Sequence, residues 1–190
     1  MGSRGKKMRL FIALKTTPYE DILYEKLKEI KPQFTEGIKW VSKENLHVTV
    51  KFLGEVKPDF LETTESIVDE VAKTFKSFTF FIEGISGFPK PTYARVLFFS
   101  IKDEGHFIEF IMRMLDKEFE QHNFKREESY IPHITFGRVK YGFVDLSSKK
   151  FSDIKFTVQA YGLTLIESVL NPEGPTYNEI KYFNFVNNNV

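Results

Sequence analysis

The sequence predicts a fold of the α+β class with two related halves, and two observations lead to this prediction. The tetrapeptide HVTV at 47–50 is followed 86 positions later (133 − 47) by the similar tetrapeptide HITF at 133–136. Arg9 and Arg95, each in an apolar run, are separated by the same offset (95 − 9). A shared offset of this kind indicates an internal duplication. Strand-like and helix-like stretches also alternate in both halves.

In the first half, apolar runs and helical periodicities predict six elements. They are strands at 8–15, 37–41, 46–53 and 78–85, a helix that ends before Pro32, and a second helix at 58–75. The first helix should start at Thr17 as the N-cap, with Pro18 in the first turn and Glu20 completing a capping box. Glycines and prolines between 84 and 91 should break the chain between the halves.

The second half repeats the pattern and then departs from it. The expected elements are a strand at 94–101, a helix at 107–119, a strand at 131–139, and closing strands at 155–169 and 178–186. The buried stripe of the helix should consist of Phe107, Phe110, Ile111, Met114, Leu115 and Phe119. The stretch 141–150 is too short to match the second helix of the first half. Residues 187–189 are all asparagine and should fray.

The two tetrapeptides lie in short apolar runs rich in β-branched and aromatic residues, which is typical of strands. Side chains at i and i+2 point to the same side of a strand. His47 and Thr49 should therefore share one face, as should His133 and Thr135. The residues between them should anchor the opposite face in a core.

Two imidazoles and two hydroxyls suit the chemistry of phosphate esters. One histidine can take a proton from the attacking oxygen while the other gives one to the leaving oxygen. Histidine does both near neutral pH because its unperturbed pKa is about 6.5. Threonine hydroxyls can donate to phosphate oxygens. One His-x-Thr occurs often by chance, and a buried histidine bonded to a carbonyl would explain it. Two copies among only four histidines favour a functional pair.

These motifs resemble those of the two-histidine phosphoesterases. The stretches RLFIAL at 9–14, LHVTVKFLGEV at 46–56 and PHITFGRV at 132–139 carry the resemblance, in order along nearly the whole chain. Within that superfamily the sequence resembles the 2′-5′ RNA ligase-like proteins, which are RNA 2′,3′-cyclic phosphodiesterases of bacteria and archaea. The family's second motif usually has leucine where this chain has Phe136. That position faces the core by parity, so the change should matter little.

The resemblance implies a bilobed fold with two pseudo-symmetric antiparallel sheets, outer helices and both motifs in a central cleft. We expect a single bilobed domain over 8–190, with lobes at roughly 8–88 and 93–185 that exchange strands. Residues 1–7 are polar and precede a second methionine. They should be a cloning remnant or a disordered, frayed end.

The resemblance also implies a reaction, the hydrolysis of a terminal 2′,3′-cyclic phosphate of RNA to a 2′-phosphate. His47 would be the proton donor to the leaving oxygen and His133 the acceptor from water, while Thr49 and Thr135 bind the phosphoryl oxygens. The residues alone do not separate acid from base, because the motifs are nearly identical. In reverse, the site would join RNA by a 2′-5′ bond without ATP, which we expect as a side activity.

Two alternatives stay open. A non-catalytic protein that binds RNA ends would use the cleft only to hold phosphate, although binding alone does not require two proton carriers. The substrate could also be a small cyclic nucleotide instead of RNA, whose fragments, such as those of tRNA, are the expected partners.

Further candidate contacts lie close to the motifs. Lys51 shares the parity of His47 and should face the cleft. Arg138 has the parity of the core face, which disfavours a substrate contact unless the strand bulges. Tyr130 and Tyr93 lie near strand ends and could stack on a base, although core packing explains them as well.

Other features of the sequence exclude whole classes of site and function. His106 and His122 lie at helix ends and should be structural or exposed. Neither motif has a second metal ligand nearby, so no metal or other cofactor is expected. No cysteine is present, which excludes disulfides and thiol nucleophiles. A net charge of +1 means that any RNA contact must come from a local patch. Without a signal peptide or a membrane span, a cytoplasmic monomer is expected.

Overall fold

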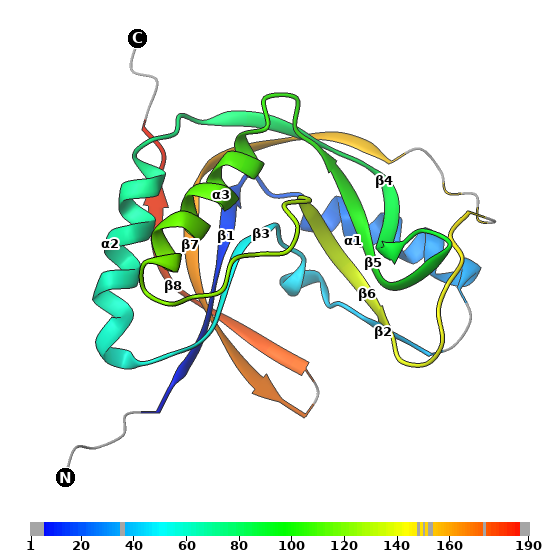
Figure 1. Cartoon of the computed structure of the whole chain (residues 1–190). Coiled ribbons are helices and arrows are strands. Elements are labelled where there is room, and N and C mark those ends of the chain that lie inside the picture. The colour runs from blue at the N-terminus through cyan, green and yellow to red at the C-terminus, as the bar shows by residue number, and fades with distance from the viewer. Residues whose placement is uncertain are drawn as a thin grey trace.

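The computed structural model describes residues 6–34, 37–147, 149, 151, 154–172 and 174–186. Its elements, in chain order, are β1 (Met8–Thr16), α1 (Glu20–Ile30), η1 (Lys31–Gln33), β2 (Ile38–Trp40), η2 (Lys43–Asn45), β3 (Thr49–Val56), η3 (Pro58–Phe60), α2 (Leu61–Ala72), β4 (Phe78–Lys90), β5 (Tyr93–Lys102), α3 (Phe107–Glu120), β6 (His133–Val139), β7 (Lys155–Asn171) and β8 (Gly174–Asn184). The expected α+β class with antiparallel strands is confirmed (Figure 1). No helix among the described residues is long and apolar enough to cross a membrane.

The expectation of two separate sheets needs correction. All the strands belong to one sheet in the order β2-β6-β5-β4-β7-β1-β3, with β8 paired to β7. Strand β4 joins the two halves because it pairs with β7 through residues 78–83 and with β5 through residues 81–90. It also runs through the glycines and prolines that should have ended it. Its register shifts around Gly84, whose φ of +78° suits glycine and lets the strand bend there.

Strands from the two halves of the sequence are interleaved in this sheet. Strand β2 pairs with β6, with Ile38 opposite Val139, and β1 pairs with β7, with Leu10 opposite Glu167. Helices α2 and α3 lie side by side at one end of the molecule, while α1 lies behind β4, β5 and β6 (Figure 1).

Helix α1 begins later than its sequence signals suggested. Thr17 does not cap it, because the Thr17 amide donates to the Gln159 carbonyl at 2.9 Å and its hydroxyl accepts from the Gln159 amide at 3.2 Å. Tyr19 is the N-cap instead, and its amide donates to the Glu20 carboxylate at 2.9 Å. Hydrogen bonds between Thr17 and Gln159 of β7 therefore replace the expected capping box.

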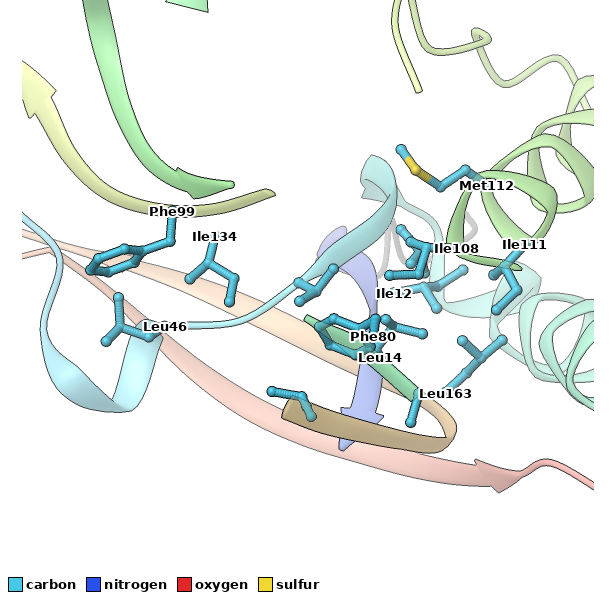
Figure 2. Packing of buried hydrophobic residues seen from close by; sticks show 14 of the residues in the cluster. Ile12, Leu14, Leu46, Phe80, Phe99, Ile108, Ile111, Met112, Ile134 and Leu163 are labelled. Atoms are coloured by element: carbon cyan, nitrogen blue, oxygen red, sulfur yellow. The ribbon is translucent and has the colours of Figure 1, made fainter. Parts of the chain in front are cut away.

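Helix α3 buries only part of the expected stripe. Ile111, Leu115 and Phe119 are fully buried as expected, but Phe107 and Phe110 are exposed, and Ile108 is fully buried instead. Figure 2 shows both isoleucines pointing toward Ile12 of β1. Apolar residues cover more than one face of this helix, so their periodicity did not select a single buried stripe.

The residues beside the two histidines are anchored in the core as expected. Leu46, Val48, Ile134 and Phe136 are all buried. Figure 2 shows Leu46 and Ile134 lying close together with Phe99. The strands that carry the two motifs therefore meet in one core cluster.

Predictions for both ends of the chain fall largely outside the described residues. Residues 1–5 and 187–189 are not among them. Lys7 is described, and its ammonium forms an exposed ion pair with Glu55 at 3.0 Å.

Candidate active site

Both His-x-Thr motifs open into one cleft of about 1290 Å³. His47 lies just before β3 and His133 is the first residue of β6. Thr49 and Thr135 also line the cleft, so all four predicted residues are brought together. Within the described residues neither threonine hydroxyl has a hydrogen-bond partner, which leaves both free to bind a ligand.

The two imidazoles are held in the same way. His47 Nδ1 lies 2.7 Å from the Asn45 carbonyl oxygen, and His133 Nδ1 lies 2.8 Å from the Ile131 carbonyl oxygen. A carbonyl only accepts, so each Nδ1 carries the hydrogen and each Nε2 is left to exchange a proton with a substrate. Asn45 is itself fixed, because its side-chain amide donates to the Pro175 carbonyl at 3.0 Å.

Aromatic rings enclose both histidines. Ring centres of Phe11 and Tyr177 lie 4.9 Å and 5.2 Å from that of His47. Phe88 and Phe98 lie 5.0 Å and 5.1 Å from His133. This packing fixes the ring orientations and keeps water away from one side of each imidazole.

Enclosure also shifts the titration of both rings. Burial is the main cause that lowers the pKa of His47 to about 4. The hydrogen bond to the Asn45 carbonyl raises this pKa, and the charge of His133 lowers it. Burial likewise lowers the pKa of His133, the Ile131 carbonyl raises it, and Arg138 lowers it. Both imidazoles are therefore neutral at pH 7 before a ligand binds.

A β-bulge changes the side-chain parity of β3. Lys51 lies opposite Ile12 and Thr49 opposite Ala13, so Val50 is an extra residue. Beyond it the alternation reverses: Lys51 is 1% exposed, while Phe52 is 43% exposed and lines the cleft.

The expectation that Lys51 contacts the substrate is corrected by its partners. Its ammonium donates to Asp116 Oδ1 at 2.5 Å and to the Lys125 carbonyl at 2.7 Å. Tyr130, the other candidate, also bonds to Asp116, with its hydroxyl 2.7 Å from Oδ2. The Arg113 guanidinium lies 4.2 Å from the centre of the Tyr130 ring. Lys51 lines the cleft and Tyr130 does not. The polar groups of both are bonded to Asp116, so they brace the loop before β6.

An equivalent bulge in β6 brings Arg138 into the cleft. Gly137 pairs with Leu97 and Thr135 with Phe98, which leaves Phe136 as the extra residue. Arg138 consequently lies on the same side as Thr135 and lines the cleft. Val50 and Phe136 are separated by the same 86 positions (136 − 50) as the histidines. The duplication thus includes the bulges.

Comparisons with known proteins identify the family. A model described as LigT-like phosphoesterase matches residues 16–98. The chain is also 33% identical over 181 residues to the RNA 2′,3′-cyclic phosphodiesterase of Archaeoglobus fulgidus, covering 93% of this chain and 99% of the relative. The chain belongs to the LigT-like phosphoesterases. The resemblance inferred from the two motifs is confirmed.

A second relative and a solved structure support this assignment. The RNA 2′,3′-cyclic phosphodiesterase of Methanocaldococcus jannaschii is 34% identical over 182 residues, covering 92% of this chain and 99% of the relative. The crystal structure of TT0787 of Thermus thermophilus has a TM-score of 0.78 and 25% identity, and the match covers 94% of this chain and 98% of that one.

Several residues of this LigT-like cleft had no clear signal in the sequence. Phe11 of β1 and Tyr177 of β8 contact each other as well as His47, with ring centres 4.9 Å apart. Arg9 also lines the cleft, with its guanidinium 5.0 Å from the centre of the Phe52 ring. The offset shared with Arg95 marked Arg9 as part of the repeat but not as part of the site. Tyr177 precedes the expected last strand, and no pattern singled it out.

Other titratable side chains lie away from the two motifs. His106 and His122 are exposed and do not line the cleft. In the part of the chain that the structure describes, no three histidine, aspartate or glutamate side chains are grouped so that they could hold a metal ion.

The pH optimum of kcat/KM, which reports on the free LigT-like protein, should differ from that of kcat, which reports on the complex with substrate. Because both imidazole pKa values are lowered, the singly protonated pair is most populated at acidic pH, so kcat/KM should peak below about pH 6.5. An anionic phosphate favours the protonated rings, so the kcat optimum should lie higher. Initial rates between about pH 4 and 9 would measure both bells, whose limbs belong to the coupled pair. A steady rise into alkaline pH would contradict this expectation.

Proposed function

We propose that this protein is an RNA 2′,3′-cyclic phosphodiesterase that opens a terminal 2′,3′-cyclic phosphate to a 2′-phosphate. The observation that supports this proposal most strongly is the pair of imidazoles in one cleft, those of His47 and His133. Each has its Nδ1 bonded to a carbonyl and its Nε2 left for the substrate. LigT-like relatives from two archaea bear the name of this activity. Neutral rings with a fixed tautomer are suited to acid–base chemistry.

In the proposed mechanism, water attacks phosphorus and the bond from phosphorus to the 3′-oxygen breaks. His133 Nε2 accepts the proton of the water, and the neighbouring Arg138 supports this role because its charge favours a neutral imidazole. His47 Nε2 donates a proton to the departing 3′-oxygen. Its low pKa in the free protein means that it acquires this proton only beside an anion such as the phosphate.

Thr49 and Thr135 complete the proposed site as hydrogen-bond donors. Their unpartnered hydroxyls can bond to the phosphoryl oxygens as negative charge builds there. Arg138 adds a positive charge on the same side of the cleft. We further propose that the protein acts as a monomer, because both His-x-Thr motifs and Arg138 line one cleft. RNA ends such as those of tRNA fragments are the proposed substrates.

A direct assay tests the proposed function. The protein is incubated in EDTA, without ATP, with an RNA oligonucleotide that ends in a 2′,3′-cyclic phosphate. A 2′-phosphate product, identified by ³¹P nuclear magnetic resonance, is expected. A His47→Ala/His133→Ala protein serves as the control. Turnover that is lost in EDTA and restored by one metal would contradict the metal-free mechanism, and an intact cyclic phosphate would contradict the activity itself.

The same groups can catalyse ring opening by an RNA hydroxyl in place of water. A 5′-hydroxyl RNA end would then attack phosphorus, the bond from phosphorus to the 3′-oxygen would break, and a 2′-5′ bond would form without ATP. We propose this ligation as a side activity, because it needs the same proton donor and acceptor. Adding an excess of RNA with a 5′-hydroxyl to the assay, and looking for a longer product, tests it.

Thr49→Val and Thr135→Val should each lower kcat by about 10- to 10³-fold with little change in melting temperature. Valine keeps the β-branched shape, and the lost hydroxyl leaves no protein group unpaired. Turnover and thermal unfolding measured on the same samples check this. A stable fold with full activity would remove that threonine from the site. A hydroxyl that satisfied a buried backbone group would instead cost about 1–3 kcal/mol of stability.

A further inference from the structure

The two faces of the sheet formed by strands β4, β5 and β6 carry different kinds of side chain. Their core face carries Ala94, Leu97, Phe99 and Ile134, which are fully buried in the same cluster as Leu27 of α1. Their other face carries the cleft, which Phe88, Thr135 and Arg138 line. Figure 1 shows α1 behind these strands. The side chains on the cleft face continue beyond the two motifs toward the turn between β4 and β5.

Strand pairing shows which side chains follow on this face. Val96 lies opposite both Phe88 and Arg138, and these two line the cleft. The register then shifts, because Pro89 lies opposite Ala94 and leaves Arg95 as an extra residue of β5. Ala94 is fully buried, whereas Arg95 and Tyr93 are exposed.

Two exposed rings form a stack at the end of this face. The ring centres of Tyr93 and Phe143 lie 4.3 Å apart with their planes at 25°, yet the residues are 41% and 52% exposed. Lys90 lies directly opposite Tyr93 on β4 and so shares its face. We refer to the resulting set as the β5 strip, which consists of Phe88, Lys90, Tyr93, Arg95, Arg138 and Phe143.

The β5 strip carries unpaired positive charge. Among the ion pairs formed by the described residues, none includes Lys90, Arg95 or Arg138. Several other exposed cations, such as Lys73 and Arg126, instead bond to a carboxylate. In a chain with a net charge of only +1, this is the local cationic patch that an RNA contact would need.

We propose that the β5 strip binds the single-stranded RNA chain on the 5′ side of the terminal cyclic phosphate. One base stacks on the Tyr93–Phe143 pair, and Arg95 and Lys90 hold backbone phosphates. Exposed aromatic rings beside cations are the usual platform for single strands, because every base has a face that can stack. The inference rests on the proposed function and makes RNA, rather than a mononucleotide, the preferred substrate class.

The length of the strip sets the length of RNA that can reach its end. Phe88 and Lys90, the partners of Val96 and Tyr93 on β4, are two positions apart (90 − 88), which is about 7 Å along a strand. About two stacked nucleotides cover that length at roughly 3.4 Å each. A hexanucleotide should therefore use the whole strip, whereas a nucleoside 2′,3′-cyclic monophosphate should not reach its aromatic end.

Kinetics on two substrates test the proposal. We expect the wild type to have a higher kcat/KM for a hexanucleotide ending in a 2′,3′-cyclic phosphate than for uridine 2′,3′-cyclic monophosphate. Tyr93→Ala or Phe143→Ala should raise the hexanucleotide KM by about 5- to 150-fold, with no change for the monophosphate. Tyr93→Phe, which keeps the ring, should behave as wild type. Phe110→Ala is the matched control, since Phe110 is an exposed ring in a separate groove on α3.

Salt dependence tests the charged part of the strip. Arg95→Ala should reduce the slope of log(kcat/KM) for the hexanucleotide against log[KCl] by about 0.7, the value for one phosphate contact on a single strand. Lys76→Ala removes an exposed charge in the α3 groove and should leave the slope unchanged.

The possible outcomes test the role of the β5 strip and the proposed function separately. If the wild type hydrolyses both substrates and the Tyr93 and Arg95 variants act on the hexanucleotide like wild type, the strip is overturned while the proposed function stands. If the wild type hydrolyses neither, the proposed function fails. The strip is then tested by fluorescence anisotropy with a labelled hexanucleotide ending in a 3′-phosphate. Equal affinity of wild type and Tyr93→Ala in that titration overturns it.

Discussion

The kcat of His47→Ala and that of His133→Ala are each expected to fall by about 10²- to 10⁴-fold, the usual effect of removing a general acid or base. Each substitution removes the only Nε2 that the cleft offers at its position, while the Thr49 and Thr135 hydroxyls remain. The double variant should lose less than the product of the single effects, because the pair acts as a unit. Steady-state rates on the cyclic-phosphate oligonucleotide measure all three.

His122→Ala provides the matched control, since His122 is exposed and lies outside the cleft. Circular dichroism should show all variants folded. Near-normal turnover by a folded His47→Ala or His133→Ala protein would remove that residue from the chemistry and leave the cleft as a phosphate-binding site only.

Lys51→Met should lower the free energy of unfolding by about 3–5 kcal/mol, the usual result of removing one partner of a buried ion pair. Asp116 is 2% exposed, and methionine would leave its carboxylate without a cation. Burial by itself raises the pKa of Asp116, but bonds from Lys51, Tyr130 and the Glu127 amide together hold it below its usual value. Urea unfolding at pH 7 measures the loss.

The loss should depend on pH in a defined direction. A carboxylate whose pKa is depressed by folding stabilises the protein above its unfolded pKa of about 3.9, and this contribution disappears as the pH falls through the folded value. The difference between wild type and Lys51→Met should therefore shrink below about pH 4.

Two variants serve as controls for the buried pair. Lys51→Met/Asp116→Asn keeps an acceptor for Tyr130 but removes the charge, so it should be more stable than Lys51→Met alone. Lys73→Met breaks an exposed pair with Asp69 and should change stability little. Equal losses in Lys51→Met and Lys73→Met would show that burial of the Lys51–Asp116 pair contributes nothing.

Sequence patterns predicted the strands because these depend on local alternation, whereas the shared cleft was expected only from the family resemblance. Parity placed Thr49 and Thr135 on the side of their histidines, and the structure agrees. Parity alone predicted that the Lys51 side chain points toward the cleft, although its ammonium is buried, and it disfavoured a substrate contact for Arg138. Both predictions failed because each residue lies beyond a β-bulge. A bulge arises from how a strand pairs with its neighbour, which the alternation within the strand does not reveal.

The aromatic walls of the cleft were beyond sequence reasoning for a different reason. Phe11 and Tyr177 come from strands far from each other in the chain, and only the pairing of β1, β7 and β8 brings them to His47. With 21 phenylalanines and 8 tyrosines, residue type alone does not mark any one ring as part of the site.

The pairing of β1 with β7 has a consequence for synthesis. Leu10 and Glu167 lie opposite each other although 157 positions separate them (167 − 10), so β1 leaves the ribosome long before this partner exists. Contacts between residues so far apart in the sequence form slowly. Until β7 is made, β1 can pair only with β3, and its other edge stays open, which makes the nascent chain prone to aggregate. A fragment that stops before β7 should therefore fail to fold, and the full chain should acquire its native structure only near the end of translation.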